Sequence, residues 1–241
     1  MGLALAGGIW QWGLPYLLGL PCWIVEEVDL GTCPPALRPA VAERIGAFIG
    51  QPIYRIWWQR SRIVAEVEAL PRIRTARLHL GWPNRVALAV APRQPLFVVS
   101  SGGKYYPVDQ EGILLEKAAS PPPSLPLVWG LAVGSKRAGE PLPPSAVQPV
   151  LDCLAAARER QVEVAHLIWL KDQTLQLHTA QNEQVRLGPN RELSRKLGLF
   201  VGIRKELQRQ GQAFEYVDVS VPEVPAWKPR GTAGLGWRGS A

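Results

Sequence analysis

The residue types that most often carry catalysis or bind metals are few in this 241-residue chain. Its three histidines, His79, His166 and His178, lie on separate predicted strands, outside any motif with metal-ligand spacing. A metal ion or a general base needs partners that converge on it. A lone histidine on a strand is more often a structural residue, so we expect no catalytic residue, no metal site and no cofactor.

Two short segments resemble chemical sites only superficially. Gly102-Gly103-Lys104 lacks the upstream glycine and the following Ser or Thr of a phosphate loop. Asp109 and Glu111 flank a predicted turn, and turn formation accounts for both. The cysteines have no ligand-like spacing, and the sequence leaves open whether any of them pair: Cys22, Cys33 and Cys153. The sequence therefore predicts a protein that is not an enzyme.

The charge of the chain excludes a nucleic-acid-binding stripe. The formal net charge is +7. Residues 24–93 carry ten Arg against six acidic residues, whereas residues 94–222 carry 14 basic and 13 acidic residues. No basic run reaches the density that phosphate binding requires. We therefore expect no nucleic-acid partner.

The N-terminal segment has no charged residue from Gly2 to Val25, a run of 24. A helix of that length exceeds the roughly 30 Å hydrocarbon core of a bilayer. The run favours a transmembrane anchor at residues 1–25. A cleaved signal peptide, which usually has a basic start, and a buried core helix are the alternatives. Acidic residues follow at Glu26 and Glu27, which favours an extracytoplasmic body, and the single methionine, Met1, leaves open a start further upstream.

Residues 24–93 predict a small α+β domain. A short strand at Ile24–Leu30 precedes two amphipathic helices, the first marked by Leu37, Val41, Ile45 and Phe48 at helical spacing. Alternating residues over 75–80 and 86–90 then predict a hairpin. The expected order is strand, helix, helix, strand, strand.

Residues 94–222 predict a second, mostly antiparallel β-domain with a helix near its C-terminal end. Short strands alternate with Pro- and Gly-rich turns. The helix is predicted over Arg191–Gln210, with Leu193, Leu197, Phe200 and Leu207 on one stripe. A last strand is predicted over Tyr216–Val221, ending at Pro222, and residues 223–241 are expected to form a flexible tail.

The stretch Glu68–Pro95 resembles the POTRA domain of the FtsQ/DivIB cell division family. Its Leu70-Pro71, Trp82-Pro83 and Arg93 fit the family's pattern, although Ala91-Pro92 replaces an acidic residue common before that arginine. A second, ordered match is similar to the family's β-domain: Val185-Arg186-Leu187-Gly188, a helix with Lys196, and Tyr216-Val217-Asp218-Val219.

This resemblance implies a single-pass scaffold of the cell inner membrane, with its domains on the periplasmic side. It implies that the last strand binds FtsB- and FtsL-like partners by β-strand addition, and that the POTRA domain contacts other divisome members. The partner-binding positions that it implies are Tyr216, Val217, Val219, Val221, Glu223 and Trp227. The alternatives are a POTRA-containing component of secretion or outer-membrane assembly, which should carry several POTRA repeats, and an unrecognised periplasmic enzyme.

Overall fold

The computed structural model describes residues 21–81, 83–170 and 172–230, and the chain divides into two compact units between Arg93 and Gln94. The predicted anchor at residues 1–25 lies almost wholly outside these residues. Across the described ranges, no helix has both the length and the apolar character that crossing a bilayer demands.

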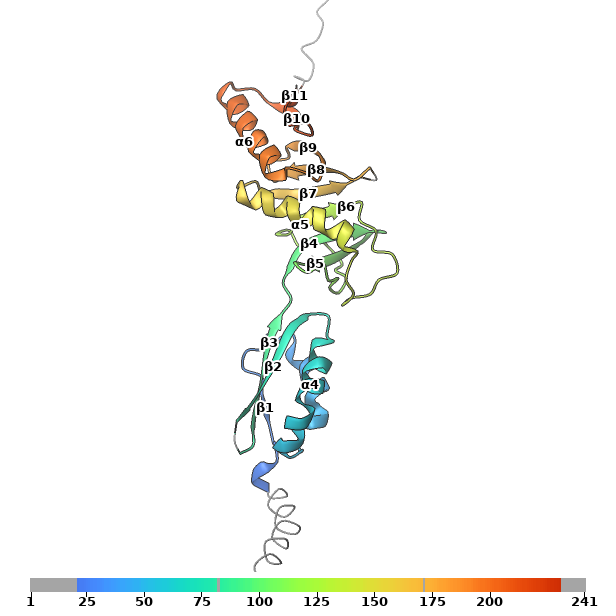
Figure 1. The fold of residues 1–241 in the computed structure, drawn as a ribbon, viewed down its shortest axis with the longest axis vertical. Helices are drawn as coiled ribbons and strands as arrows, with labels where there is room; N and C mark the ends of the chain where they lie inside the picture. The colour runs from blue at the N-terminus through green and yellow to red at the C-terminus, as the bar shows by residue number, and fades with distance from the viewer. Residues whose placement is uncertain (1–20, 82, 171, 231–241) are drawn as a thin grey trace, which may run out of the picture. The chain divides into compact units, whose positions relative to one another are not determined.

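The first unit has the predicted order of strand, two helices and two strands (Figure 1). Its sheet has the strand order β1-β3-β2, with β1 parallel to β3 and β2 antiparallel to β3. The first strand is shorter than predicted, because Ile24 instead forms an isolated bridge with Pro52. The elements are β1 (Val28–Asp29), α3 (Arg38–Ile45), the 3-10 helix η3 (Gly46–Phe48), α4 (Ile53–Glu68), β2 (Ile73–Gly81) and β3 (Arg85–Pro92).

The core of this unit explains why these residues form these elements. The predicted stripe of the first helix is buried, together with one face of α4 and the inward residues of the hairpin. The acidic end of α4 also holds the sheet: Glu68 Oε1 accepts the backbone N–H of Ala76 at 2.9 Å. Arg93 Nε donates to the carbonyl of Ile73 at 3.1 Å, which ties the end of the unit to the start of β2. Trp82 of the resemblance lies outside the described residues.

The second unit is a sheet with the strand order β11-β10-β9-β8-β7-β6-β4-β5 and two long helices. The predicted stripe of the second helix, Leu193, Leu197, Phe200 and Leu207, is buried. The elements are β4 (Pro95–Ser101), β5 (Lys104–Asp109), β6 (Leu127–Trp129), α5 (Pro144–Glu159), β7 (Val164–Trp169), β8 (Thr174–Thr179), β9 (Gln184–Pro189), α6 (Leu193–Arg209), β10 (Phe214–Asp218) and β11 (Ala226–Pro229).

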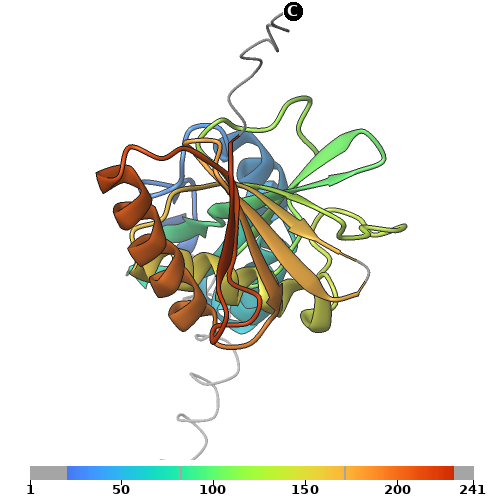
Figure 2. The same ribbon diagram turned by 90° about the horizontal axis from the view of Figure 1, so that it is seen from above.

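The sheet is mixed, whereas the sequence predicted a mostly antiparallel one. Three neighbouring pairs are parallel: β4 with β6, β6 with β7, and β9 with β10. Parallel neighbours need a crossover connection, usually a helix. α5 supplies it between β6 and β7, and α6 supplies it between β9 and β10, so both helices pack on one face of the sheet (Figure 2).

The two edges of this sheet differ. The outer side of β5 is covered by residues 113–118, which form bridges from Leu114 to Val108 and from Ala118 to Tyr105. Leu115 also donates its N–H to the carbonyl of Pro107 at 2.8 Å. At the other edge lies β11, with no neighbouring strand on its outer side among the described residues. β11 falls in the segment that was expected to be a flexible tail.

Candidate partner-binding edge

The predicted terminal strand is not the edge of the sheet. β10 is paired on both sides, with β9 in parallel and with β11 in antiparallel orientation. Tyr216, for example, lies opposite both Gln184 and Lys228. Strand addition to the last predicted strand, Tyr216–Val221, would need a free edge, and β10 has none, because the chain turns after β10 and adds one further strand.

The six predicted partner-binding residues fall into two groups. Val217 and Val219 are fully buried in the core, and the N–H of Val219 donates to the carbonyl of Arg186 at 2.9 Å. Tyr216 is half-buried, with the Arg186 guanidinium 3.9 Å from the centre of its ring. The remaining three are on the surface: Val221, Glu223 and Trp227. Trp227 keeps 39% of its surface exposed on the outermost strand, so this end of the unit remains accessible.

The backbone of β11 turns alternate residues toward and away from β10. Val219 donates its N–H to β9, so the backbone groups of its alternate neighbours, Asp218 and Tyr216, point toward β11. Arg230 donates its N–H to the carbonyl of Ala213 at 2.9 Å, which gives the same alternation along β11. The β11 partners of those two neighbours, Ala226 and Lys228, therefore face inward, and Trp227 and Pro229 face outward. Because proline has no N–H, Trp227 supplies the outward N–H of β11, while both outward residues supply carbonyls.

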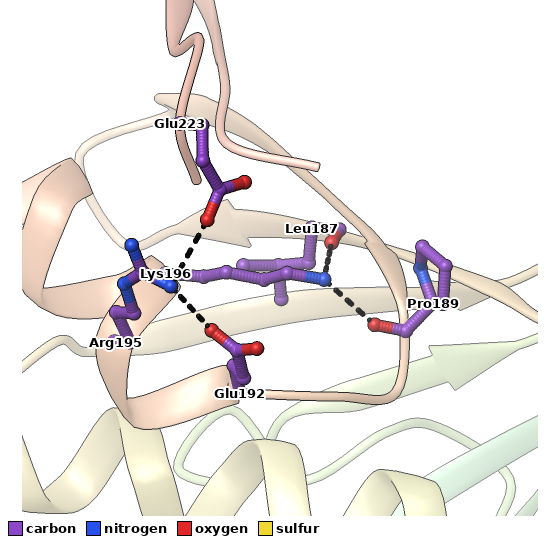
Figure 3. Close-up of polar contacts among 6 residues, drawn as sticks. All are labelled: Leu187, Pro189, Glu192, Arg195, Lys196 and Glu223. Atoms are coloured by element: carbon purple, nitrogen blue, oxygen red, sulfur yellow. Dashed lines mark hydrogen bonds and ion pairs between the residues drawn. The ribbon is translucent and has the colours of Figure 1, made fainter. Parts of the chain in front are cut away.

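The turn before β11 is attached to α6 (Figure 3). Glu223 Oε1 lies 3.1 Å from Arg195 Nη1, and the same nitrogen lies 2.8 Å from Glu192 Oε2. The two carboxylates raise the pKa of Arg195, the hydrogen bond with Glu192 contributing most. At the far side of β11, Lys228 Nζ pairs with Glu215 Oε2 on β10 at 2.8 Å. One ion pair thus holds the turn before the edge strand, and a second joins the edge strand to β10.

A buried lysine fixes the end of β9 beneath this turn (Figure 3). Lys196 Nζ donates to the carbonyls of Leu187 and Pro189 at 2.8 and 2.9 Å, and only 3% of the residue is exposed. Burial lowers the pKa of Lys196, and Glu192 partly opposes that effect. The lysine noted in the family resemblance therefore has a structural role, since it donates to two carbonyls at the end of β9, of which that of Pro189 also accepts the N–H of Arg191 at 2.7 Å.

Gly188, also part of the resemblance, allows the chain after β10 to pass close to β9. Its φ is +65°, a left-handed conformation that favours glycine. A Cβ atom there would lie 2.7 Å from Cβ of Ser220. The motif Val185–Gly188 thus combines two inward core residues with the close approach that sets the path to β11.

Elsewhere in the described residues, two histidines lie close together, but without the third ligand that a metal site would need. His166 and His178 lie directly opposite each other on β7 and β8, with ring centroids 6.5 Å apart. Burial, and to a lesser degree His166, lowers the pKa of His178. In the described part of the chain, no three His, Cys, Asp or Glu residues gather as a metal would need. Asp109 serves its turn, since its Oδ1 accepts the N–H groups of Glu111 and Ile113, both at 2.9 Å.

The cysteines are free thiols rather than a disulfide pair. Cys22 is exposed, whereas Cys33 and Cys153 are buried. Burial raises the pKa of Cys153 to about 12, so its thiol stays protonated and unreactive.

Comparison with known proteins decides the family. Residues 97–220, slightly more than half of the chain, match the family model described as "Cell division protein FtsQ/DivIB, C-terminal". The chain belongs to the FtsQ/DivIB family. This membership confirms the predicted resemblance and the prediction of a non-catalytic cell division protein, and it favours division over the alternative of secretion or outer-membrane assembly.

Individual members of the family are distant relatives of the chain. The Cell division protein FtsQ of Chloroflexus aurantiacus is 29% identical over 188 residues, which cover 73% of this chain and 65% of that protein. The Cell division protein FtsQ of Myxococcus fulvus is 27% identical over 239 residues, covering 94% and 81%. The match thus spans less than two thirds of the Chloroflexus protein.

Among solved structures, the major extracytoplasmic domain of the trans isomer of DivIB from Geobacillus stearothermophilus matches with a TM-score of 0.31 and 15% identity. That match covers 49% of this chain and 97% of the solved one.

Proposed function

We propose that the chain is a single-pass membrane scaffold of bacterial cell division. Residues 1–25 anchor it in the cell inner membrane, and its two units lie on the extracytoplasmic side. There it recruits FtsB- and FtsL-like proteins to the septum, while the first unit acts as a POTRA domain that contacts other divisome members. Family membership and the uncharged run from Gly2 to Val25 support this proposal.

The partner adds an extended segment to β11. The observation that carries this step is the difference between the two edges of the sheet: residues 113–118 cover β5, and no described strand covers β11. An exposed edge offers backbone groups to an incoming strand. At this edge the carbonyls of Trp227 and Pro229 accept hydrogen bonds from the partner strand, and the N–H of Trp227 donates one to it. The position of this one N–H therefore sets the register of the partner strand. The exposed side chains of Val221 and Trp227 then contact the partner.

The decisive experiment separates the backbone of Trp227 from its side chain. Trp227→Pro removes the outward N–H without removing an inward bond, whereas Trp227→Ala removes the indole and keeps the N–H. We expect Trp227→Pro to abolish co-purification of an FtsB-like partner from membranes, and Trp227→Ala to weaken it. Circular dichroism checks that both variants remain folded. Wild-type recovery of the partner by Trp227→Pro would refute strand addition at β11.

Val219→Pro is the matched comparison inside the sheet. It removes the N–H that donates to Arg186 and disturbs a fully buried side chain. We expect it to destabilise the second unit by about 1–3 kcal/mol as well as to reduce partner binding. Urea unfolding distinguishes it from Trp227→Pro, which should unfold at nearly the wild-type midpoint.

The division role is tested in cells. Depletion of the protein should give filaments or clusters of undivided cells, which microscopy detects. Normal division after depletion would be incompatible with the proposed scaffold.

A further inference from the structure

Three large apolar side chains of the first unit are exposed within ten positions of the sequence. Ile49 keeps 46% of its surface exposed, Trp57 55% and Trp58 84%. Ile49 lies in the turn before α4, and the two tryptophans lie in its first turns. Exposed large apolar side chains at such nearby positions are a candidate interaction surface. We call Ile49, Trp57 and Trp58 the apolar patch.

The patch lies where the uncharged N-terminal run enters the fold. Val25 donates its N–H to the carbonyl of Gln51 at 3.1 Å, and Gly50 donates to the carbonyl of Val25 at 2.8 Å. Ile24 bridges Pro52, the residue before α4. Trp57 and Trp58 follow Ile53 by four and five residues, which is roughly 6–8 Å along a helix. Any bilayer that holds the N-terminal run therefore lies close to the start of α4.

Arginines surround the patch. Arg55, Arg60 and Arg62 are exposed on the same helix, and the Arg60 guanidinium lies 4.4 Å from the centre of the Trp57 ring. Arg62 pairs with Glu66 at 2.8 Å, whereas neither Arg55 nor Arg60 forms an ion pair with a carboxylate of the described residues. Guanidinium groups bind phosphate through paired N–H donors.

The acidic residues of the entry point lie on its other side. Glu26 and Glu27 line a hollow with Arg85, at the tip of the β2–β3 hairpin. Both residues therefore lie beside the hairpin. The α4 side of the entry point combines exposed tryptophan with arginine, the composition typical of the level of lipid headgroups.

We propose that the apolar patch lies in the headgroup layer of the phospholipid bilayer, with Arg55 and Arg60 contacting lipid phosphates. This inference rests on the proposed membrane anchor and extends it: the first unit rests on the bilayer through α4, so the anchor is not its single attachment. Tryptophan is suited to that layer because its ring is apolar and its N–H is polar.

The test uses the full chain in phosphatidylcholine–phosphatidylglycerol vesicles, with a nitroxide attached to a single introduced cysteine. Cys22→Ser removes the exposed native thiol, and Cys33 and Cys153 are buried. The probe sits at Ser61→Cys, one turn beyond Trp58 and exposed. The control probe is Ala65→Cys, which is also exposed, on the same helix face and roughly 6 Å further along.

We expect the vesicles to lower the accessibility of the Ser61 probe to a water-soluble nickel chelate severalfold, and to leave the Ala65 probe unchanged. The pair Trp57→Gln and Trp58→Gln should restore the accessibility of the Ser61 probe. If both probes stay equally accessible in chains that remain with the vesicles after an alkaline wash, the inference is wrong and the patch serves a protein partner. Chains that the wash releases would refute the membrane anchor, and the inference with it.

Discussion

Glu223, in the turn before β11, pairs with Arg195 in the first turn of α6, with 3.1 Å between Oε1 and Nη1. The pair connects the edge strand to a helix whose inner face is part of the core. Both side chains are largely exposed, so the pair should contribute little to global stability. Its effect should instead be local, on the mobility of the edge that we propose to bind a partner.

Arg195→Ala tests that local role. We expect an unchanged midpoint of urea unfolding, faster amide hydrogen exchange at Ala226 and Lys228, and faster dissociation of the partner, because the turn before β11 loses its attachment. Arg209→Ala is the control, since it removes an ion pair with Glu206 on the same helix away from this turn. Equal exchange rates at β11 in both variants would show that the Arg195–Glu223 pair does not restrain the edge.

Lys196→Met should destabilise the second unit. The methionine fills the space of the lysine stem but removes the donor to the carbonyl of Leu187, whereas the carbonyl of Pro189 keeps the N–H of Arg191. A buried carbonyl that loses its donor costs about 1–3 kcal/mol, so the free energy of unfolding measured in urea should fall by that amount. Lys205→Met, at an exposed position of α6, should change it little. An equal loss of stability in both variants would show that the hydrogen bonds of Lys196 to the end of β9 do not stabilise the unit.

Gly188→Ala should be more destabilising than Gly211→Ala. Both glycines have a left-handed backbone, with φ of +65° and +68°, which costs an alanine roughly 1–2 kcal/mol. At Gly211 a Cβ atom would meet no atom within 4 Å, whereas at Gly188 it would lie 2.7 Å from Ser220 Cβ. Overpacking adds about 1–3 kcal/mol, and the shifted turn should also weaken partner binding. Calorimetry and co-purification measure the two effects.

The stability of the second unit should fall in mild acid because of His178. Burial lowers its pKa from 6.5 in the folded protein, so the unfolded chain takes up a proton more readily. The stabilisation is therefore present above pH 6.5 and is lost as the pH falls through the folded pKa. Urea titrations at about pH 7.5 and about pH 5.5 should show this loss, and His178→Gln should reduce it. A pH dependence that His178→Gln leaves unaltered would assign the effect to other groups.

The sequence predicted the elements whose side chains repeat with a clear period. The stripe from Leu37 to Phe48 and the stripe from Leu193 to Leu207 are both buried, because a helix needs one continuous apolar face to pack. The hairpin of β2 and β3 was equally clear from alternation. Strand neighbours were harder: the helix between β9 and β10 was predicted, but the parallel pairing of these two strands, which that helix implies, was not.

The sequence missed the edge strand because β11 has no buried side to produce a pattern. All four residues, Ala226–Pro229, are exposed, and two prolines precede the strand at Pro222 and Pro225. The strand forms by pairing with β10, which is a tertiary effect. One signal was available: Trp227 and Pro229 alternate with Ala226 and Lys228, and a proline on an outer strand is tolerated where its missing N–H faces solvent.

The spacing of Pro225, Trp227 and Pro229 has a consequence for the protein at high local concentration. The β11 edges of two copies of the chain can pair only if each offers several N–H groups to the other. The outward-facing positions of β11 provide one such group, the N–H of Trp227. Indiscriminate edge-to-edge aggregation, the usual hazard of an uncovered sheet, is thereby discouraged. The edge can still accept a partner strand, but only one whose acceptor lies opposite the N–H of Trp227.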